Sequence, residues 1–311
     1  EVTVTTGALK KALYSSEAKD FCGSVILADL GIGRPLFEEG CEPCAFLLEQ
    51  KDLVLPHRRK QNVNKGSFGH VAVVCEEKTG AALIAGKAAF HFGAGLVTLV
   101  NKHSEPQSPL YELMTSCNFP ANTTAVALGM GLGRKDETSF EYLSLLENLK
   151  NIPCVLDADI FYSKRIKNFL ENTAAPVVLT PHPKEFSALL ENCGLGKYSV
   201  KEITENAFDL VKKFCMTFKN TVLLLKGASV LIGNAKDENF LLYVNNLGTN
   251  ALSKGGSGDV LSGMIAALLA QGESALSSAI NASLAHALAS AKASCDYSLT
   301  PDSLIALTAK L

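Results

Sequence analysis

Hydrophobic residues along most of the chain fall in short continuous runs that alternate with longer helix-like stretches. The runs are rich in β-branched residues and too short for helices, which indicates strands buried on both faces. They are His70–Cys75, Leu96–Val100, Ala125–Gly129, Cys154–Leu156, Val177–Leu179 and Val222–Leu225. Helices are expected at Gly80–Phe92 and at about 139–150, 184–191 and 203–218. This alternation predicts an α/β fold with a central, mostly parallel sheet covered by helices on both faces.

The last third of the chain departs from this alternation. Ser229–Ile232 and Phe240–Val244 flank a polar stretch and predict a β-hairpin. Val260–Ala270 and Ala275–Ser294 are apolar nearly all round, and the first of them ends at Gly272. We therefore expect two buried helices here.

The first 45 residues have a sparser pattern. Val2–Thr5 and Ser24–Ala28 predict short strands around a helix-like Ala8–Leu13, too few elements for a core of their own. Residues 33–45 contain two glycines and two prolines among acidic residues, which predicts a linker. We therefore expect an N-terminal remnant at 1–32, a linker at 33–45 and one main domain at 46–311.

Composition excludes several classes of partner. The chain has 311 residues, of which 47% are hydrophobic, so it can bury a large core. A net charge of −2 gives no sign of a nucleic-acid surface or of a membrane-binding patch. The start lacks the features of a signal peptide, and no apolar run reaches the length of a membrane span. Nine cysteines, scattered through apolar segments, favour a reducing compartment. We expect a soluble, cytoplasmic protein.

One glycine-rich turn near the C-terminus carries the clearest chemical signal. Residues 254–263 read Lys-Gly-Gly-Ser-Gly-Asp-Val-Leu-Ser-Gly, a loop that becomes the first turn of a buried helix. Free backbone N–H groups at a helix start bind phosphate together with the helix dipole, and glycine lets the backbone come close to it. Asp259 in that turn would stay ionised and could take a proton from a hydroxyl group beside the phosphate. The turn therefore predicts a phosphoryl-transfer site with Asp259 as its base.

Other unusual residues follow the predicted strands, where open parallel sheets bind their ligands. The segments are Gly129–Gly133, Asp157–Asp159, Pro181–Glu185 and Lys226–Ala228. Asp157 and Asp159 could instead be a cap and a turn residue. Glu185 could reach Mg²⁺ through water or could merely favour a helix N-terminus. His182 is held between two prolines, which favours a functional role, and Lys226 at the end of an apolar strand needs a partner such as nucleotide phosphate.

Together these motifs resemble a known family. The succession is Lys65–Val71, Gly93–Thr98, Gly129–Gly133, Asp157–Asp159, Thr180–Glu185, Lys226–Ala228 and Gly255–Leu261. Over about residues 46–311 it is similar to the ADP/ATP-dependent NAD(P)H-hydrate dehydratases, which implies a ribokinase-like three-layer sandwich. Residues 1–32 look like the tail of the NAD(P)H-hydrate epimerase domain of bifunctional bacterial enzymes, and no epimerase activity is expected from them. The glycine spacing fits neither a Walker A loop nor a Rossmann fingerprint.

The resemblance implies a role for each motif. The residues that it implies for the pocket of hydrated NADH or NADPH are Ala94, Gly131, His182 and Asp259. Its residues for the adenine nucleotide are Lys226, Gly227, Ala228, Ser229, Val230, Gly256 and Gly258. Glu185 falls where ribokinase relatives carry a magnesium-linked glutamate, which implies an outer-shell role for it.

The implied reaction repairs a damaged nicotinamide nucleotide. Asp259 would accept the proton of the 6-hydroxyl group while that oxygen attacks the terminal phosphoryl group of ADP or ATP, with Mg²⁺ as cofactor, and the ring nitrogen would then expel phosphate. ADP is the preferred nucleotide because of the apparent domain fusion, and the resemblance implies a homo-oligomer, a tetramer or an octamer. Two alternatives are a ribokinase-like kinase of a small alcohol, such as a hydroxymethylpyrimidine or a thiazole, and a catalytically silent nucleotide-binding sensor.

Two segments depart from the pattern of the family. Glu76-Glu77-Lys78 stand where a glycine-rich loop is usual, and Asn245–Asn250 lack a proline common at that position. The first departure bears on how closely the backbone approaches the substrate. The second bears on contacts next to the anion site.

Overall fold

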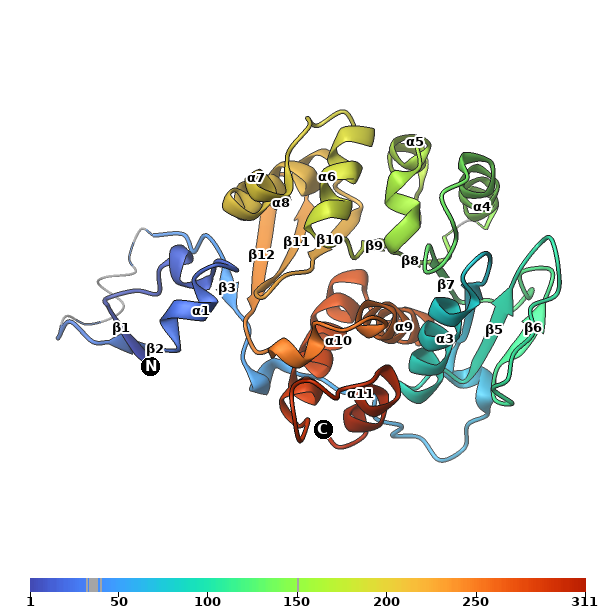
Figure 1. The fold of residues 1–311 in the computed structure, drawn as a ribbon, viewed down its shortest axis with the longest axis horizontal. Helices are drawn as coiled ribbons and strands as arrows, with labels where there is room; N and C mark the ends of the chain where they lie inside the picture. The colour runs from blue at the N-terminus through green and yellow to red at the C-terminus, as the bar shows by residue number, and fades with distance from the viewer. Residues whose placement is uncertain (32, 34–38, 40, 150) are drawn as a thin grey trace.

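A ten-stranded sheet lies between two layers of helices in the computed structural model, which describes residues 1–31, 33, 39, 41–149 and 151–311 (Figure 1). In spatial order its strands are β3 (Phe46–Leu47), β12 (Asn239–Asn245), β11 (Val230–Lys236), β10 (Thr221–Leu225), β9 (Val177–Leu179), β8 (Cys154–Leu156), β7 (Ala125–Leu128), β4 (His70–Val74), β5 (Leu96–Val100) and β6 (Met114–Ser116). Among these described strands only β11 runs antiparallel to its neighbours. The predicted mostly parallel sheet is confirmed.

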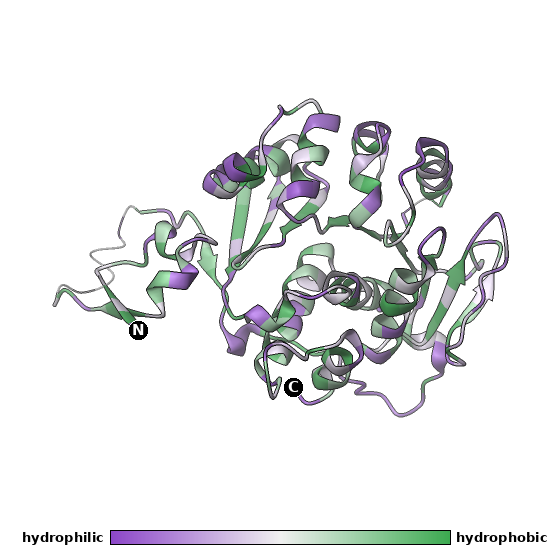
Figure 2. Ribbon diagram, viewed as in Figure 1, coloured by the Kyte–Doolittle hydropathy of each residue, from purple (hydrophilic) through white to green (hydrophobic). Residues whose placement is uncertain are grey.

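Helices cover both faces of the sheet. One layer holds α3 (Thr79–His91), α9 (Ser257–Ala270), α10 (Ala275–Ala291) and α11 (Pro301–Thr308), and the other holds α4 (Asp136–Asn148), α5 (Ile166–Asn172), α6 (Pro183–Asn192), α7 (Val200–Glu205) and α8 (Ala207–Thr217). Along β4, Val71 and Val73 join the first layer's core while Ala72 and Val74 join the second's. Because the central strands are buried on both faces, they are apolar without alternation, whereas the edge strands β3 and β6 keep exposed side chains such as Phe46 and Met114 (Figure 2).

Several predicted boundaries were wrong. The expected helix over about 203–218 is two helices, α7 and α8, because the backbone of Asn206 leaves the helical region at φ −113° and ψ 21°. The hairpin strands are longer than expected, since the side chain of Asn234 donates a hydrogen bond to the carbonyl of Thr221 and keeps this polar stretch in β11. Short elements such as β6 and α11 were not predicted.

The N-terminal segment forms a small unit beside the main body (Figure 1). Here β1 (Val2–Thr6) pairs in parallel with β2 (Ser24–Ala28), as separate strands outside the large sheet. The expected helix over Ala8–Leu13 was wrong: Lys10 Nζ donates to the carbonyl of Thr6 and shapes a turn, and only a 3-10 helix at Lys11–Tyr14 follows. A four-residue helix, α1 (Lys19–Cys22), completes the unit.

Tyr14 docks the N-terminal unit on the main body, since its side chain is buried within the core on the α8 side of the sheet. Much of the predicted linker, at 34–38 and 40, lies outside the described residues. Within the described ranges, no helix combines the length and the apolarity that crossing a bilayer requires.

Candidate active site

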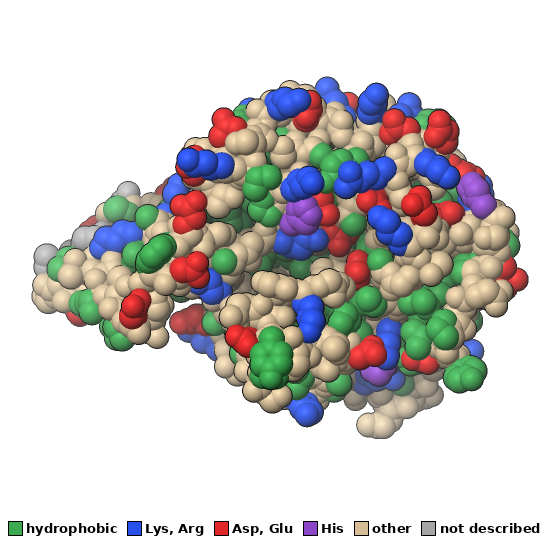
Figure 3. Space-filling view, viewed as in Figure 1, with side chains coloured by type: hydrophobic (Ala, Val, Ile, Leu, Met, Phe, Trp, Pro, Cys, Tyr) green, Lys and Arg blue, Asp and Glu red, His purple; other side chains and the backbone are tan. Residues whose placement is uncertain are grey.

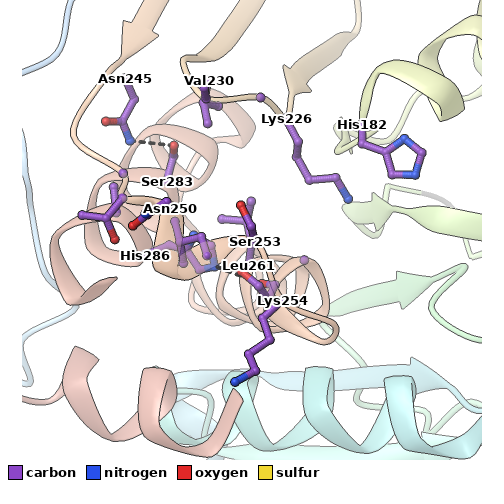
Figure 4. Close-up of a pocket in the computed structure, with 18 of the residues that line it drawn as sticks. His182, Lys226, Val230, Asn245, Asn250, Ser253, Lys254, Leu261, Ser283 and His286 are labelled. Carbon is purple, nitrogen blue, oxygen red and sulfur yellow. Dashed lines mark hydrogen bonds between the residues drawn. The ribbon is translucent and has the colours of Figure 1, made fainter. Parts of the chain in front are cut away.

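A cleft of about 900 Å³ opens beyond the carboxyl ends of the parallel strands. Its walls come from the loops after β8, β9, β10 and β12 and from the N-terminal turn of α9. Figure 3 shows this face hollowed, with a histidine and basic side chains gathered along one edge of the hollow. In Figure 4, Lys226 and His182 project from the sheet side, while Ser253, Leu261 and His286 lie on the opposite side. The expected clustering after strands therefore produces one concave site.

A buried ion pair spans the floor of the cleft. Lys226, which follows β10, places its Nζ 2.8 Å from Oδ1 of Asp157, which follows β8. Asp157 also accepts hydrogen bonds from the hydroxyl of Ser262 at 2.7 Å and from the N–H of Ala158 at 2.9 Å. Burial acts to lower the pKa of Lys226, but Asp157 and Glu185 outweigh it and raise that pKa, so Lys226 stays a cation.

The glycine-rich turn places free backbone donors next to this cation. Gly256 begins α9 with a left-handed φ of +89°. A Cβ atom on Gly258 would lie 3.2 Å from Lys226 Nζ, so the first turn of α9 and the lysine are in contact. Among the described residues, no acceptor is found for the N–H groups of Gly258 and Asp259. A helix start with free N–H groups beside a lysine is a binding site for phosphate.

The two neighbouring glycines of this turn differ in what they tolerate. At Gly256 an alanine Cβ would lie 2.6 Å from Pro301 Cγ in a left-handed backbone, whereas at Gly255 nothing lies within 4 Å. We expect Gly256→Ala to lower the free energy of unfolding by about 1 to 2 kcal/mol. Gly255→Ala is the matched control and should leave stability close to the wild-type value. Urea unfolding of both variants checks this, and equal losses would contradict the role of the left-handed turn.

Asp259 is the acidic residue of the cleft whose carboxylate is available to accept a proton. It lines the cleft in the first turn of α9, and among the described residues its carboxylate has no hydrogen-bond partner. Burial raises its pKa to about 7; Asp157 and Glu185 add to the rise and Lys226 opposes it. A carboxyl group with a pKa near neutrality is suited to general base catalysis. Asp157, by contrast, already accepts three hydrogen bonds.

His182 and Glu185 hold each other at the start of α6. The N–H of His182 donates to Glu185 Oε2 at 2.9 Å, and the N–H of Glu185 donates to His182 Nδ1 at 3.2 Å. Burial and Lys226 lower the pKa of His182, so its imidazole is neutral at pH 7. Glu185 caps the N-terminus of α6 in this way, and its Oε2 also lies 3.8 Å from Lys226 Nζ.

The far end of the cleft holds two residues of α10, Ser283 and His286, that the sequence interpretation missed. Asn245 donates to the hydroxyl of Ser283 at 2.9 Å, as Figure 4 shows. His286 of α10 lies with Nε2 2.9 Å from the carbonyl of Ser257, and burial lowers its pKa to about 4. A neutral His286 therefore donates a hydrogen bond to the carbonyl of Ser257 and stabilises the first turn of α9. The sequence does carry one sign of these residues, since Ser283 and His286 are polar positions within a predicted helix that is otherwise mostly apolar.

The predicted site residues do not all reach the cleft. Those that line it are His182, Glu185, Lys226, Gly227, Ala228, Val230, Gly256, Gly258 and Asp259. Gly131 lies in the loop after β7, where its carbonyl accepts from the N–H of Lys78. Ser229 is buried, and its hydroxyl donates to Asn246 Oδ1 at 2.9 Å, joining two loops of the wall. Ala94 lies in the core just before β5, at the opposite edge of the sheet from the cleft.

Comparison with known proteins identifies the family. A family model described as NAD(P)H-hydrate dehydratase matches residues 70–310. The chain belongs to this family. It is 41% identical over 308 residues to the bifunctional NAD(P)H-hydrate repair enzyme Nnr of Helicobacter pylori, with 98% of this chain and 62% of that protein covered. It is also 32% identical over 241 residues to the ADP-dependent (S)-NAD(P)H-hydrate dehydratase of Neisseria meningitidis, with 72% of this chain and 77% of that protein covered.

Solved structures of dehydratase-family and related proteins share the fold. The ADP/ATP-dependent NAD(P)H-hydrate dehydratase of Bacillus subtilis, co-crystallised with ATP and Mg²⁺, matches with a TM-score of 0.71 at 23% identity, covering 86% of this chain and 97% of that chain. A ribokinase-like superfamily protein of Enterococcus faecalis matches with a TM-score of 0.67 at 19% identity, covering 86% and 96%. The predicted ribokinase-like three-layer sandwich is therefore confirmed.

Proposed function

We propose that this chain dehydrates (6S)-hydrated NADH or NADPH, using ADP as the phosphoryl donor. Membership of the dehydratase family supports the substrate class, and the relative of Neisseria meningitidis is named ADP-dependent. The observation that carries the proposal is Asp259, a carboxylate with a pKa of about 7 beside free helix N–H groups and a lysine. This arrangement suits activation of a hydroxyl group next to a phosphate.

In the proposed reaction Asp259 removes the proton of the 6-hydroxyl group as its oxygen attacks the terminal phosphorus of ADP. The bond between that phosphorus and AMP breaks, and AMP leaves. Free N–H groups of Gly258 and Asp259, together with Lys226, stabilise the charge that develops on the phosphoryl oxygens. The ring nitrogen's lone pair then expels phosphate, and loss of a proton from the adjacent carbon restores the dihydronicotinamide.

Magnesium would be held chiefly by the nucleotide. No group of three metal-ligating side chains occurs within the described ranges, and Asp157 is already bonded to Lys226 and Ser262. Glu185 has Oε2 on the N–H of His182, and its Oε1 lies 3.2 Å from His182 Nε2, so the carboxylate could reach the ion only through water. The residues present thus fit a water-mediated site. When bound, Mg²⁺ would neutralise charge on the phosphates.

The decisive experiment incubates the protein with hydrated NADH, Mg²⁺ and either ADP or ATP. We expect the absorbance of reduced nicotinamide to return, faster with ADP, with AMP and phosphate as the other products. In a parallel assay with a hydroxymethylpyrimidine or a thiazole alcohol in place of hydrated NADH, a stable phosphorylated product would instead indicate the kinase of a small alcohol. Nucleotide binding without turnover would indicate the silent sensor, and either result would contradict the proposal.

The pKa of Asp259 predicts how the rate depends on pH. A general base must be deprotonated, so kcat/KM should fall about tenfold per pH unit below pH 7 and level off above it. His182 titrates below its ordinary range and should not interfere above pH 6.5. A steady-state pH profile from 5.5 to 8.5 measures this. A flat profile over that range would exclude Asp259 as the base that limits the rate.

For the domain organisation, we propose a dehydratase domain at 46–311 preceded by the tail of an epimerase domain at 1–32. Support comes from the Helicobacter pylori relative, a bifunctional enzyme that matches 98% of this chain. The predicted linker at 33–45 separates the two. We also keep the expectation of a homo-oligomer, a tetramer or an octamer, which analytical ultracentrifugation would test.

A further inference from the structure

Two residues of the N-terminal unit, Lys19 and Asp20, line the cleft, and Lys19 is hydrogen-bonded to its wall. Lys19, in the first turn of α1, directs its ammonium group at three backbone carbonyls. Its Nζ lies 2.8 Å from the oxygen of Ala228, 3.0 Å from that of Asn246 and 2.7 Å from that of Gly248. Lysine has three N–H donors, and each has an acceptor here.

These three carbonyls belong to two separate loops of the cleft. Ala228 lies between β10 and β11, in the segment assigned to the nucleotide, and the other two follow β12. Apart from Lys19, Ser229 joins the same loops through its hydrogen bond to Asn246. A Cβ atom on Gly227 would lie 2.8 Å from the hydroxyl of Ser16, so the N-terminal unit also packs directly against the first loop.

We propose that Lys19 is a positioning residue for the adenine nucleotide, because it fixes the spacing of the two loops that form this wall. The inference rests on the proposed nucleotide site. Lys19 does not serve as a phosphate ligand, since its three donors are already used. The N-terminal unit is then part of the nucleotide site, and displacing it would weaken nucleotide binding without altering the chemical step.

The ammonium group is half-buried against these carbonyls, and burial lowers its pKa from the ordinary value. Carbonyl oxygens replace water around it, so the group stays bonded while it is charged. Lys11 offers a useful contrast. It anchors the same unit through Asp209 at 3.6 Å and the ring of Phe208, and it contacts neither loop of the cleft.

The test compares Lys19→Met with Lys11→Met by titration calorimetry with ADP and Mg²⁺. We expect the Kd for ADP to rise about tenfold in Lys19→Met and to stay at the wild-type value in Lys11→Met. In the dehydration assay, KM for ADP should rise with kcat unchanged. Hydrogen exchange should become faster in residues 227–229 and 245–248 of Lys19→Met.

Lys19→Arg separates positioning from charge. A planar guanidinium cannot reproduce a tetrahedral ammonium group bonded to three carbonyls, so this variant should also bind ADP more weakly than the wild type. Wild-type affinity in Lys19→Arg would mean that charge alone acts, and wild-type affinity in Lys19→Met would mean that Lys19 has no role. Either result overturns the inference while the proposed function stands. If the wild-type protein itself fails to bind ADP, both fall.

Discussion

Asp259→Asn is expected to lower the turnover of hydrated NADH by about 10³-fold while the fold is kept, because the variant loses the carboxylate that lies in the first turn of α9 at the anion site and has no hydrogen-bond partner among the described residues. Affinity for ADP should stay the same or rise slightly, since a negative charge near the phosphates is removed. Single-turnover assays and calorimetry measure the two effects separately. Loss of nucleotide binding together with turnover would mean that Asp259 holds the nucleotide instead.

The same substitution should make the protein more stable at pH 8. In the folded protein the pKa of Asp259 is about 7, above its ordinary value of 3.8, so ionising it costs stability as the pH rises between these values. Asparagine removes that cost. We expect a gain of about 1 to 2 kcal/mol at pH 8, less than the full linkage because the cleft is open to solvent, and no gain below pH 4.

Asp302→Asn is the matched control for Asp259→Asn. Asp302 also lies in the first turn of a helix, α11, but it is exposed and paired with Lys87 at 2.9 Å outside the cleft. This variant should keep wild-type turnover and show no stabilisation at pH 8. A gain of stability in the control equal to that in Asp259→Asn would contradict the raised pKa as its cause.

Lys226→Met is expected to damage both binding and stability. The side chain of Asp157 is only 2% exposed and would lose its ionic partner, which should cost about 3 kcal/mol of unfolding free energy. Loss of a cation beside the phosphates should raise the Kd for ADP by about 10 to 100-fold. Urea unfolding and calorimetry measure the two losses.

A second substitution in the same background separates these losses. Asp157→Asn combined with Lys226→Met removes both charges, so much of the stability should return while the affinity for ADP stays low. If the double variant is no more stable than Lys226→Met, the unpaired Asp157 is not the cause of the instability. Recovery of ADP binding in the double variant would contradict a direct role of Lys226 at the phosphates.

The sequence was sufficient to predict the sheet because its strands are buried on both faces. Leu96–Val100 and Cys154–Leu156 were predicted with their exact bounds, since a strand buried on both faces is mostly apolar. The polar exception, Thr98, is buried with its hydroxyl 2.7 Å from His70 Nε2. Short surface elements such as α11 were missed. Their few apolar positions give a periodic pattern too brief to recognise.

The candidate site was partly predictable for a topological reason. Asp157, His182 and Lys226 each follow a strand, and β8, β9 and β10 are neighbours in the sheet, so their placement at one edge follows from the order of the strands. His286 could not be found in this way, because it lies within an apolar helix. Lys19 could not be found either, since its partners come two hundred residues later and no local pattern links them.

The pairing of β3 with β12 determines how much of the chain must be synthesised before the fold can be completed. Phe46 and Leu47 are among the first residues of the main body, and they pair in parallel with Tyr243 and Val244. Lys19 likewise cannot form its hydrogen bonds until Ala228 and Gly248 have been synthesised. While the chain is still being synthesised, β3 and Lys19 have already left the ribosome, but β12 and Ala228, with which they pair, have not. The proposed nucleotide site can be completed only when both parts of the chain are in place, and adenine nucleotide that binds the completed site would stabilise it by mass action.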